Sequence, residues 1–130
     1  MFTSHCATIL IVDDSPENLM VLTELLSPSY RVLAAQSGEK CLRIASGKTR
    51  PDLILMDMRM PQMDGLEATR RLRELGCKMP IVALTANAMA EDRARCLAQG
   101  MDDFLAKPIS LMRLRECLQR YFHPELPDRR

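Results

Sequence analysis

Five side chains that could do chemistry stand at the ends of short apolar runs in this sequence. They are three carboxylates, one hydroxyl and one amine, namely Asp13, Asp14, Asp57, Thr85 and Lys107. Two carboxylates about 4 Å apart repel each other by roughly 4 kcal/mol at an effective dielectric constant of about 20. A bound cation would relieve that repulsion, and a small set of oxygen ligands with open positions suits Mg²⁺. If the three carboxylates meet in space, the sequence predicts a magnesium site.

The amine and the hydroxyl extend this prediction to phosphoryl chemistry. Lys107 can place a point charge on one phosphoryl oxygen, and the hydroxyl of Thr85 can donate to another. One carboxylate would then be the nucleophile. Asp57 is the candidate because it stands alone, whereas Asp13 and Asp14 are paired and better suited to hold the metal. Each residue type also has an ordinary use, since aspartates form turns and caps and a lysine can simply neutralise a carboxylate.

The elements that would bring these residues together alternate along the chain. Five short apolar runs, several nearly continuous in Val, Ile and Leu, are typical of parallel strands covered on both faces. These runs are residues 8–13, 31–35, 52–57, 81–85 and 103–106. Segments of helical periodicity lie between them, which predicts an α/β fold. We expect a flavodoxin-like (βα)5 doubly wound parallel sheet of strand order 2-1-3-4-5, with the site at the carboxyl ends of its strands.

Serines and glycines mark the ends of the predicted helices, as they commonly do. The opening signals are Ser15-Pro16 for the first helix, Ser37 for the second and Ser110 for the fifth. The closing signals are Gly76 after a third helix over 66–75 and Gly100 after a fourth over 88–99. The predicted core-facing residues of the first and fifth helices are Leu19, Leu22, Leu25 and Leu26, then Leu111, Leu114, Cys117, Leu118 and Tyr121. Three arginines of the third helix are expected to form a solvated face or a partner contact: Arg70, Arg71 and Arg73.

The composition is that of an ordinary folded domain. The chain has 130 residues, of which 47% are hydrophobic and 27% charged, and a formal net charge of +1. Such a balance predicts no direct binding to nucleic acid, and no apolar run approaches the roughly 20 residues of a membrane span. Five scattered cysteines without a C-x-x-C pair predict neither a zinc site nor disulfides. We therefore expect a reducing, cytoplasmic location.

Four segments together resemble the receiver domain of two-component response regulators. They are residues 9–14 (ILIVDD), 51–65 (PDLILMDMRMPQMDG), 81–86 (IVALTA) and 103–108 (DFLAKP). The resemblance covers about residues 7–122. We therefore expect one receiver domain over residues 1–130, with 123–130 as a tail or the start of a linker. Some stretches look more like receivers of hybrid sensor histidine kinases, and others resemble receivers joined to downstream signalling domains in a multidomain regulator. Both favour a receiver from a longer protein over a single-domain regulator.

This resemblance implies how the acidic residues work. Asp57 would accept a phosphoryl group from a phosphohistidine of a partner sensor histidine kinase or histidine phosphotransfer protein. Asp14, Asp57 and the backbone carbonyl of Arg59 would bind Mg²⁺, and Asp13 would assist nearby, often through water. Arg59 and Asn87, two residues after the acceptor and after the threonine, would tune the lifetime of the phosphate.

The resemblance also implies a switch. Lys107 and Thr85 would bind the phosphoryl group, and Phe104 would turn inward as Thr85 moves toward the phosphate. The face of helix 4, strand 5 and helix 5 would then contact a downstream protein target or a covalently linked domain. The Lys107–Pro108 peptide bond would be cis. Gly65 would be the turn residue after the phosphorylated strand.

Three other functions are weaker matches to these residues. A Mg²⁺-dependent phosphatase of the haloacid-dehalogenase type needs a general acid two residues after its nucleophile, where this chain has Arg59. A flavodoxin-like cofactor module needs a Ser/Thr/Gly-rich phosphate loop after the first strand, where Asp13 and Asp14 stand. A pseudo-receiver would keep the fold for protein contacts alone. We expect no enzyme beyond self-phosphorylation and self-dephosphorylation, although the chain could belong to a histidine kinase polypeptide, and either a monomer or a phosphorylation-dependent dimer.

Overall fold

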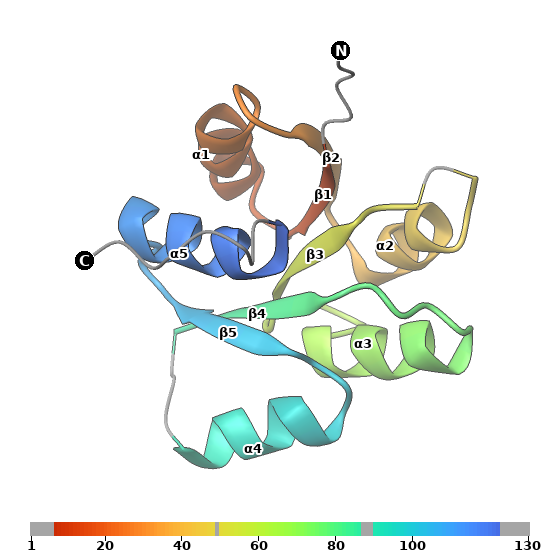
Figure 1. The fold of residues 1–130 in the computed structure, drawn as a ribbon. Coiled ribbons are helices and arrows are strands. Elements are labelled where there is room, and N and C mark those ends of the chain that lie inside the picture. Colours follow the sequence, from red (N-terminus) through yellow and green to blue (C-terminus); the bar gives the residue numbers. More distant parts are fainter. Residues whose placement is uncertain (1–6, 49, 87–89, 123–130) are drawn as a thin grey trace.

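Short apolar runs form the strands of this protein, and the amphipathic segments between them form its helices. The computed structural model describes residues 7–48, 50–86 and 90–122. Strands and helices alternate strictly along this part of the chain (Figure 1). The strands are β1 (Thr8–Val12), β2 (Arg31–Ala35), β3 (Leu53–Asp57), β4 (Ile81–Thr85) and β5 (Asp103–Ala106). The helices are α1 (Pro16–Leu26), α2 (Gly38–Ala45), α3 (Gly65–Glu74), α4 (Ala90–Ala98) and α5 (Leu111–Phe122).

These strands form one parallel sheet, and its order is β2-β1-β3-β4-β5. The predicted fold class and strand order are therefore confirmed. In the register of the sheet, Val12 pairs with Met56, and Asp57 pairs with Leu84. The carboxyl ends of β1, β3 and β4 are thus nearly level, so the residues that follow them lie at one edge.

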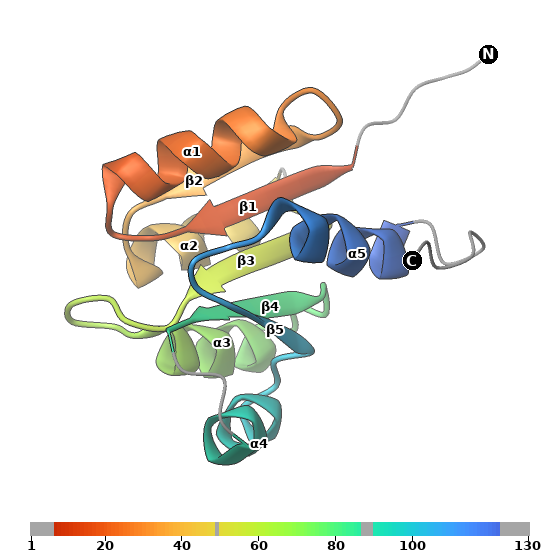
Figure 2. The same ribbon diagram turned by 90° about the vertical axis from the view of Figure 1, so that its left-hand side faces the viewer.

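Helices cover both faces of the sheet, α1 and α5 on one side and α2, α3 and α4 on the other (Figure 2). Alternate strand residues serve the two layers, because successive side chains of a strand point to opposite faces. Ile9 and Ile11 pack with the leucines of α1 and α5, whereas Leu10 and Val12 pack in the layer of α2 and α3. Burial on both faces explains the unbroken apolar runs of β1 and β3.

The predicted helix ends agree with the structure. Ser15 Oγ and Ser37 Oγ each accept a hydrogen bond from the backbone N–H three residues later, at the start of α1 and α2. Gly76 and Gly100 follow α3 and α4 with φ values of +89° and +105°, a region that favours glycine. The predicted beginning of the fourth helix at residue 88 lies outside the described residues. Within those residues, no helix is long and apolar enough to cross a membrane.

Two predicted core positions are wrong. Leu25 is 38% exposed and Leu111 is 39% exposed. On α1 the residues that face the sheet are Leu19, Leu22 and Leu26, and Leu25 lies to the side of that stripe. Leu111 is the first residue of α5, which precedes the helix's buried face. Spacing of apolar residues indicated these helices, but it overestimated the width of their buried faces.

Candidate functional site

The residues predicted to do chemistry meet at the carboxyl edge of the sheet. Asp57 is the last residue of β3, and Thr85 is the last residue of β4. Asp13 and Asp14 follow β1, and Lys107 follows β5. Four strands therefore contribute to one site, which is the geometry expected at the switch point of an open parallel sheet.

The three carboxylates form a compact cluster. One oxygen each from Asp13, Asp14 and Asp57 lies within 4.8 Å of the other two. Asp13 and Asp57 are 1% and 4% exposed, whereas Asp14 is exposed. Hard oxygen ligands on one open edge fit a divalent cation such as Mg²⁺, which keeps several of its waters. The donor set therefore fits the predicted metal.

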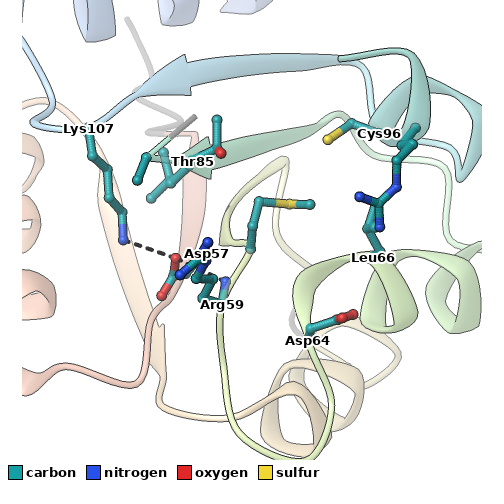
Figure 3. Close-up of a pocket in the computed structure, with 11 residues that line it drawn as sticks. Asp57, Arg59, Asp64, Leu66, Thr85, Cys96 and Lys107 are labelled. Carbon is teal, nitrogen blue, oxygen red and sulfur yellow. Dashed lines mark hydrogen bonds and ion pairs between the residues drawn. The ribbon is translucent and has the colours of Figure 1, made fainter. Parts of the chain in front are cut away.

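Lys107 is the cation that neutralises part of this cluster. Its Nζ donates to Asp57 Oδ1 at 2.9 Å and lies 3.7 Å from Asp13 Oδ2 (Figure 3). The Lys107 backbone N–H donates to the Thr85 carbonyl at 2.8 Å, which fixes the lysine beside the end of β4. The peptide bond from Lys107 to Pro108 is cis. The ammonium thus lies between the two buried carboxylates and nearer to the predicted acceptor.

Burial raises the pKa of Asp57 above its usual value and is the largest influence on it. The hydrogen bond from Lys107 opposes this shift, and the negative charge of Asp13 adds to it. The Arg59 backbone N–H, 3.4 Å from Asp57 Oδ1, is a weaker lowering influence on the same pKa. Burial and the Asp13 charge therefore disfavour the ionised form of Asp57, whereas Lys107 and the Arg59 N–H favour it.

A cavity of about 310 Å³ opens beside Asp57. Thr85 and Lys107 line it together with Asp57, so the predicted nucleophile and both predicted phosphoryl-binding residues share one space. Arg59, which is labelled in Figure 3, and Arg95 line the same cavity. This cavity presents several hydrogen-bond donors around one carboxylate, an arrangement that suits an incoming anionic group.

The turn after β3 is built closely around the acceptor. A Cβ atom on Gly65 would lie 2.5 Å from the Asp57 backbone oxygen. The Gly65 backbone N–H also donates to the Met58 carbonyl at 3.2 Å. Only glycine fits there without displacing the backbone that carries Asp57, so a turn role for Gly65 has a steric reason.

The predicted switch residue Phe104 is half-buried on β5 and contacts α4. The guanidinium carbon of Arg93 lies 4.0 Å from the centre of the Phe104 ring, a cation–π contact between the two elements. Nothing in the sequence reading pointed to Arg93. Asn87, the second predicted lifetime-tuning residue, lies outside the described residues.

Arg73 is not part of a solvated face, which corrects one prediction for the third helix. Its guanidinium donates to the carbonyls of Gly100, Cys77 and Met79 at 2.8–3.0 Å and pairs with Asp102 at 2.9 Å. Arg73 therefore ties the end of α3 to the turn before β5. Its neighbours Arg70 and Arg71 do form the expected exposed pairs, with glutamates one turn away.

Asn18 is a site residue that the sequence reading missed. Its Nδ2 donates to Asp13 Oδ2 at 3.2 Å, while the Ser15 backbone N–H donates to Asp13 Oδ1 at 2.9 Å. An amide on the first turn of a helix that follows an acidic pair was the available signal. Asn18 was overlooked because polar residues on an exposed helix turn are common.

Comparison with known proteins agrees with this geometry. Residues 9–119 match the family model of the response regulator receiver domain. The chain is 44% identical over 114 residues to sensor histidine kinase RcsC of Salmonella typhi and 40% identical over 126 residues to sensor histidine kinase GacS of Pseudomonas protegens. These matches cover 87% and 92% of this chain, but only 12% and 14% of the two kinases. The chain therefore spans about one-eighth of the length of these relatives.

Solved structures give the same match. The receiver domain of sensor histidine kinase PA1611 from Pseudomonas aeruginosa has a TM-score of 0.79 and 45% sequence identity. That match covers 90% of this chain and 98% of the other, and the PA1611 structure holds a magnesium ion coordinated in its active site cleft. Chemotaxis protein CheY4 of Vibrio cholerae has a TM-score of 0.82 and 30% identity, over 91% of this chain and 100% of the other.

Proposed function

This chain belongs to the response regulator receiver domain family, and we propose that Asp57 is its phosphoacceptor. The observation that carries the proposal is the position of the Asp57 carboxylate. It is buried at the end of the central strand and accepts a hydrogen bond from Lys107. Two further carboxylates lie beside it, and it lines a cavity that Thr85 also lines.

In the proposed reaction, a carboxylate oxygen of Asp57 attacks the phosphorus of a phosphohistidine. A P–O bond to Asp57 forms as the P–N bond breaks, and the imidazole keeps the electron pair of that bond. Lys107 and Thr85 donate to the transferred phosphoryl oxygens, which carry the charge of the transition state. The phosphoryl group ends as an aspartyl phosphate, and water later attacks it to release inorganic phosphate.

The carboxylates of Asp13, Asp14 and Asp57, together with the backbone carbonyl of Arg59, would hold Mg²⁺. The ion would offset negative charge on the phosphoryl oxygens and on the carboxylates that surround them. The magnesium ion in the PA1611 receiver, at 45% identity, supports this assignment.

The donor would be a histidine of a sensor histidine kinase or of a histidine phosphotransfer protein. Support comes from the relatives, which are sensor histidine kinases that contain a matching segment. The phosphorylated state would shift Thr85 and Phe104 and alter the face of α4, β5 and α5, where Phe104 and Arg93 already join two of these elements. That face would contact a downstream protein or a linked domain. We further propose that the chain acts in the cytoplasm and turns over no substrate other than its own phosphate.

Arg59 and Asn87 would set how long the phosphate survives. Arg59 lines the acceptor cavity, so its cation can contact the phosphate or shield it from water. Arg59→Ala is expected to change the decay rate of the aspartyl phosphate, measured after the donor is removed. An unchanged rate would leave Arg59 as a solvated side chain with no part in the lifetime.

The test of the proposed function is intact mass after incubation with Mg²⁺ and acetyl phosphate. We expect a gain of one phosphoryl group that Asp57→Asn and EDTA each abolish. Asp64→Asn is the matched control, because Asp64 caps α3 and lines the same cavity but lies outside the carboxylate cluster. If no gain occurs with acetyl phosphate or with a phosphohistidine donor, and beryllofluoride with Mg²⁺ causes no change in the NMR spectrum of the protein, the chain is a pseudo-receiver.

A further inference from the structure

Asp13 is the most buried member of the carboxylate cluster, and it accepts two hydrogen bonds and forms one ion pair. The side chain is 1% exposed. The Ser15 backbone N–H donates to Asp13 Oδ1 at 2.9 Å, and the Asn18 amide donates to Oδ2 at 3.2 Å. Lys107 Nζ lies 3.7 Å from the same Oδ2. A buried carboxylate needs such donors, because leaving its oxygens unpaired is costly.

Lys107 has two carboxylates within reach, yet it bonds only to one. Its Nζ is 2.9 Å from Asp57 Oδ1 and 3.7 Å from Asp13 Oδ2. An ammonium beside two carboxylates pairs with the one whose oxygens accept fewer other hydrogen bonds, because unpaired buried oxygens are costly. Asp13 already has the Asn18 amide on Oδ2, so it competes less strongly for the lysine.

From this arrangement we propose that Asn18 is a positioning residue for metal-assisted phosphorylation. Its amide holds the Asp13 carboxylate in place and thereby leaves the Lys107 ammonium paired with Asp57. The inference rests on the proposed function, since it assigns Asn18 a part in the same site. Asn18 touches neither the acceptor nor the reacting atoms, and it acts through Asp13 and Lys107.

Removal of the amide would have two consequences. The Asp13 carboxylate would lose the hydrogen bond that fixes Oδ2 and would be held at Oδ1 by the Ser15 backbone N–H, which weakens its support of the metal. Oδ2 of Asp13 would then attract Lys107, its ion-pair partner at 3.7 Å, more strongly, and Lys107 would shift away from Asp57, where the phosphoryl group must arrive. Loss of a group that orients a metal ligand commonly lowers metal affinity or activity about 10- to 100-fold.

A purely structural role for Asn18 can be separated from this one. Its backbone N–H donates to Ser15 Oγ at the start of α1, and that bond survives any side-chain substitution. The Asn18 side chain is exposed, so its loss opens no cavity in the core. Alanine and leucine also have higher helix propensity than asparagine, and neither change should weaken α1.

The test uses Asn18→Ala and Asn18→Leu, the latter close to asparagine in shape but without a donor. Met20→Ala is the matched control, because Met20 is 63% exposed on the same helix. Titration calorimetry with Mg²⁺ alone gives the metal affinity. The phosphorylation rate with acetyl phosphate is then measured across Mg²⁺ concentrations, and thermal unfolding in EDTA reports any structural effect.

Both Asn18 variants are expected to bind Mg²⁺ about tenfold more weakly and to be phosphorylated several-fold more slowly at saturating Mg²⁺, with an unfolding temperature in EDTA close to that of the unmodified chain. Met20→Ala should match the unmodified chain in all three measurements. If both variants bind Mg²⁺ within twofold of the unmodified chain, the inference is overturned and the proposed function stands. If the unmodified chain neither binds Mg²⁺ nor gains a phosphoryl group, the proposed function fails and the inference fails with it.

Discussion

Replacement of the proposed acceptor Asp57 by asparagine should stabilise the metal-free protein. Asp57 carries a buried charge, and burial is the largest influence on its raised pKa. Asparagine has the same shape without the charge. The variant would therefore lose phosphorylation and gain stability at once, as expected where a site is built for function at the expense of the fold.

The size of the expected gain in unfolding free energy follows from the charges around Asp57. Carboxylate oxygens of Asp13 and Asp14 lie within 4.8 Å, so each repels Asp57 by roughly 3.5 kcal/mol at an effective dielectric constant of about 20. Lys107 at 2.9 Å attracts it by roughly 6 kcal/mol on the same scale. These contributions nearly cancel, especially since Asp14 is exposed and screened, and the cost of burial remains. We expect Asp57→Asn to add about 2 kcal/mol to the free energy of unfolding.

The pH dependence of stability checks independently whether the Asp57 charge destabilises the fold. The folded-state pKa of Asp57 is above the unfolded value, so the cost of its charge is fully present above the folded pKa. That cost is relieved as the pH falls through the folded pKa, and it is absent below the unfolded value of about 3.9. The stability difference between the variant and the unmodified chain should therefore narrow on acidification.

The assay is thermal unfolding in EDTA at pH 7 and at pH 4.5. At pH 7 the Asp57→Asn variant should unfold about 8 °C higher, since about 1 kcal/mol corresponds to roughly 4 °C for a domain of this size. Glu24→Gln is the control, because Glu24 is exposed and lies outside the carboxylate cluster, and it should change stability by no more than about 0.5 kcal/mol, as exposed substitutions usually do. An Asp57→Asn variant that is no more stable than the unmodified chain at pH 7, or a difference that does not narrow at pH 4.5, would refute the reasoning.

Three further predictions test other parts of the structure. Arg73→Ala should lower the free energy of unfolding by about 2–3 kcal/mol, because charged hydrogen bonds are lost. Arg71→Ala loses an exposed ion pair and should lower it by about 0.5 kcal/mol. Equal losses of the two variants in urea unfolding would contradict a stabilising role of Arg73 between α3 and the turn before β5. Gly65→Ala should slow phosphorylation and lower the unfolding temperature, because its Cβ would lie 2.5 Å from the Asp57 backbone oxygen; a variant phosphorylated at the normal rate would show that the turn can adjust. Burial raises the pKa of Cys41 and Cys117 to about 12, so neither thiol should react with a disulfide reagent at pH 8 until the protein unfolds, and labelling of either in the native state, mapped by mass, would argue against this burial.

Much of this fold could be predicted from the sequence because its signals are local. The unbroken apolar runs identify strands buried on both faces, and serine and glycine signals mark the helix ends. Strand order then followed from handedness and from the commonest five-strand arrangement. The Asp57, Thr85 and Lys107 positions at strand ends followed from the same topology.

The sequence could not reveal contacts that depend on tertiary packing. Arg73 lies among other arginines on α3, and its ties to the Gly100 carbonyl join residues 27 positions apart. Similarly, Leu25 has the spacing of a core residue, but the sheet below α1 covers only a narrow stripe of that helix. Periodicity reports which residues can face the core, whereas the neighbouring elements decide how many of them do.

The structure supplies a physical reason for proposing Asp57 rather than Asp13 as the nucleophile, which the sequence could only suggest by position. Both carboxylates are buried, but their donors differ. Asp13 accepts hydrogen bonds at 2.9 and 3.2 Å on its two oxygens and has Lys107 nearby. Asp57 has Lys107 at 2.9 Å and a long bond of 3.4 Å, both on Oδ1. A carboxylate whose charge is already well satisfied gains little by sharing its electrons, whereas a poorly satisfied one at the edge of a donor-lined cavity is the better nucleophile. The unequal division of donors between two similar aspartates therefore supports the proposal that Asp57 is the nucleophile.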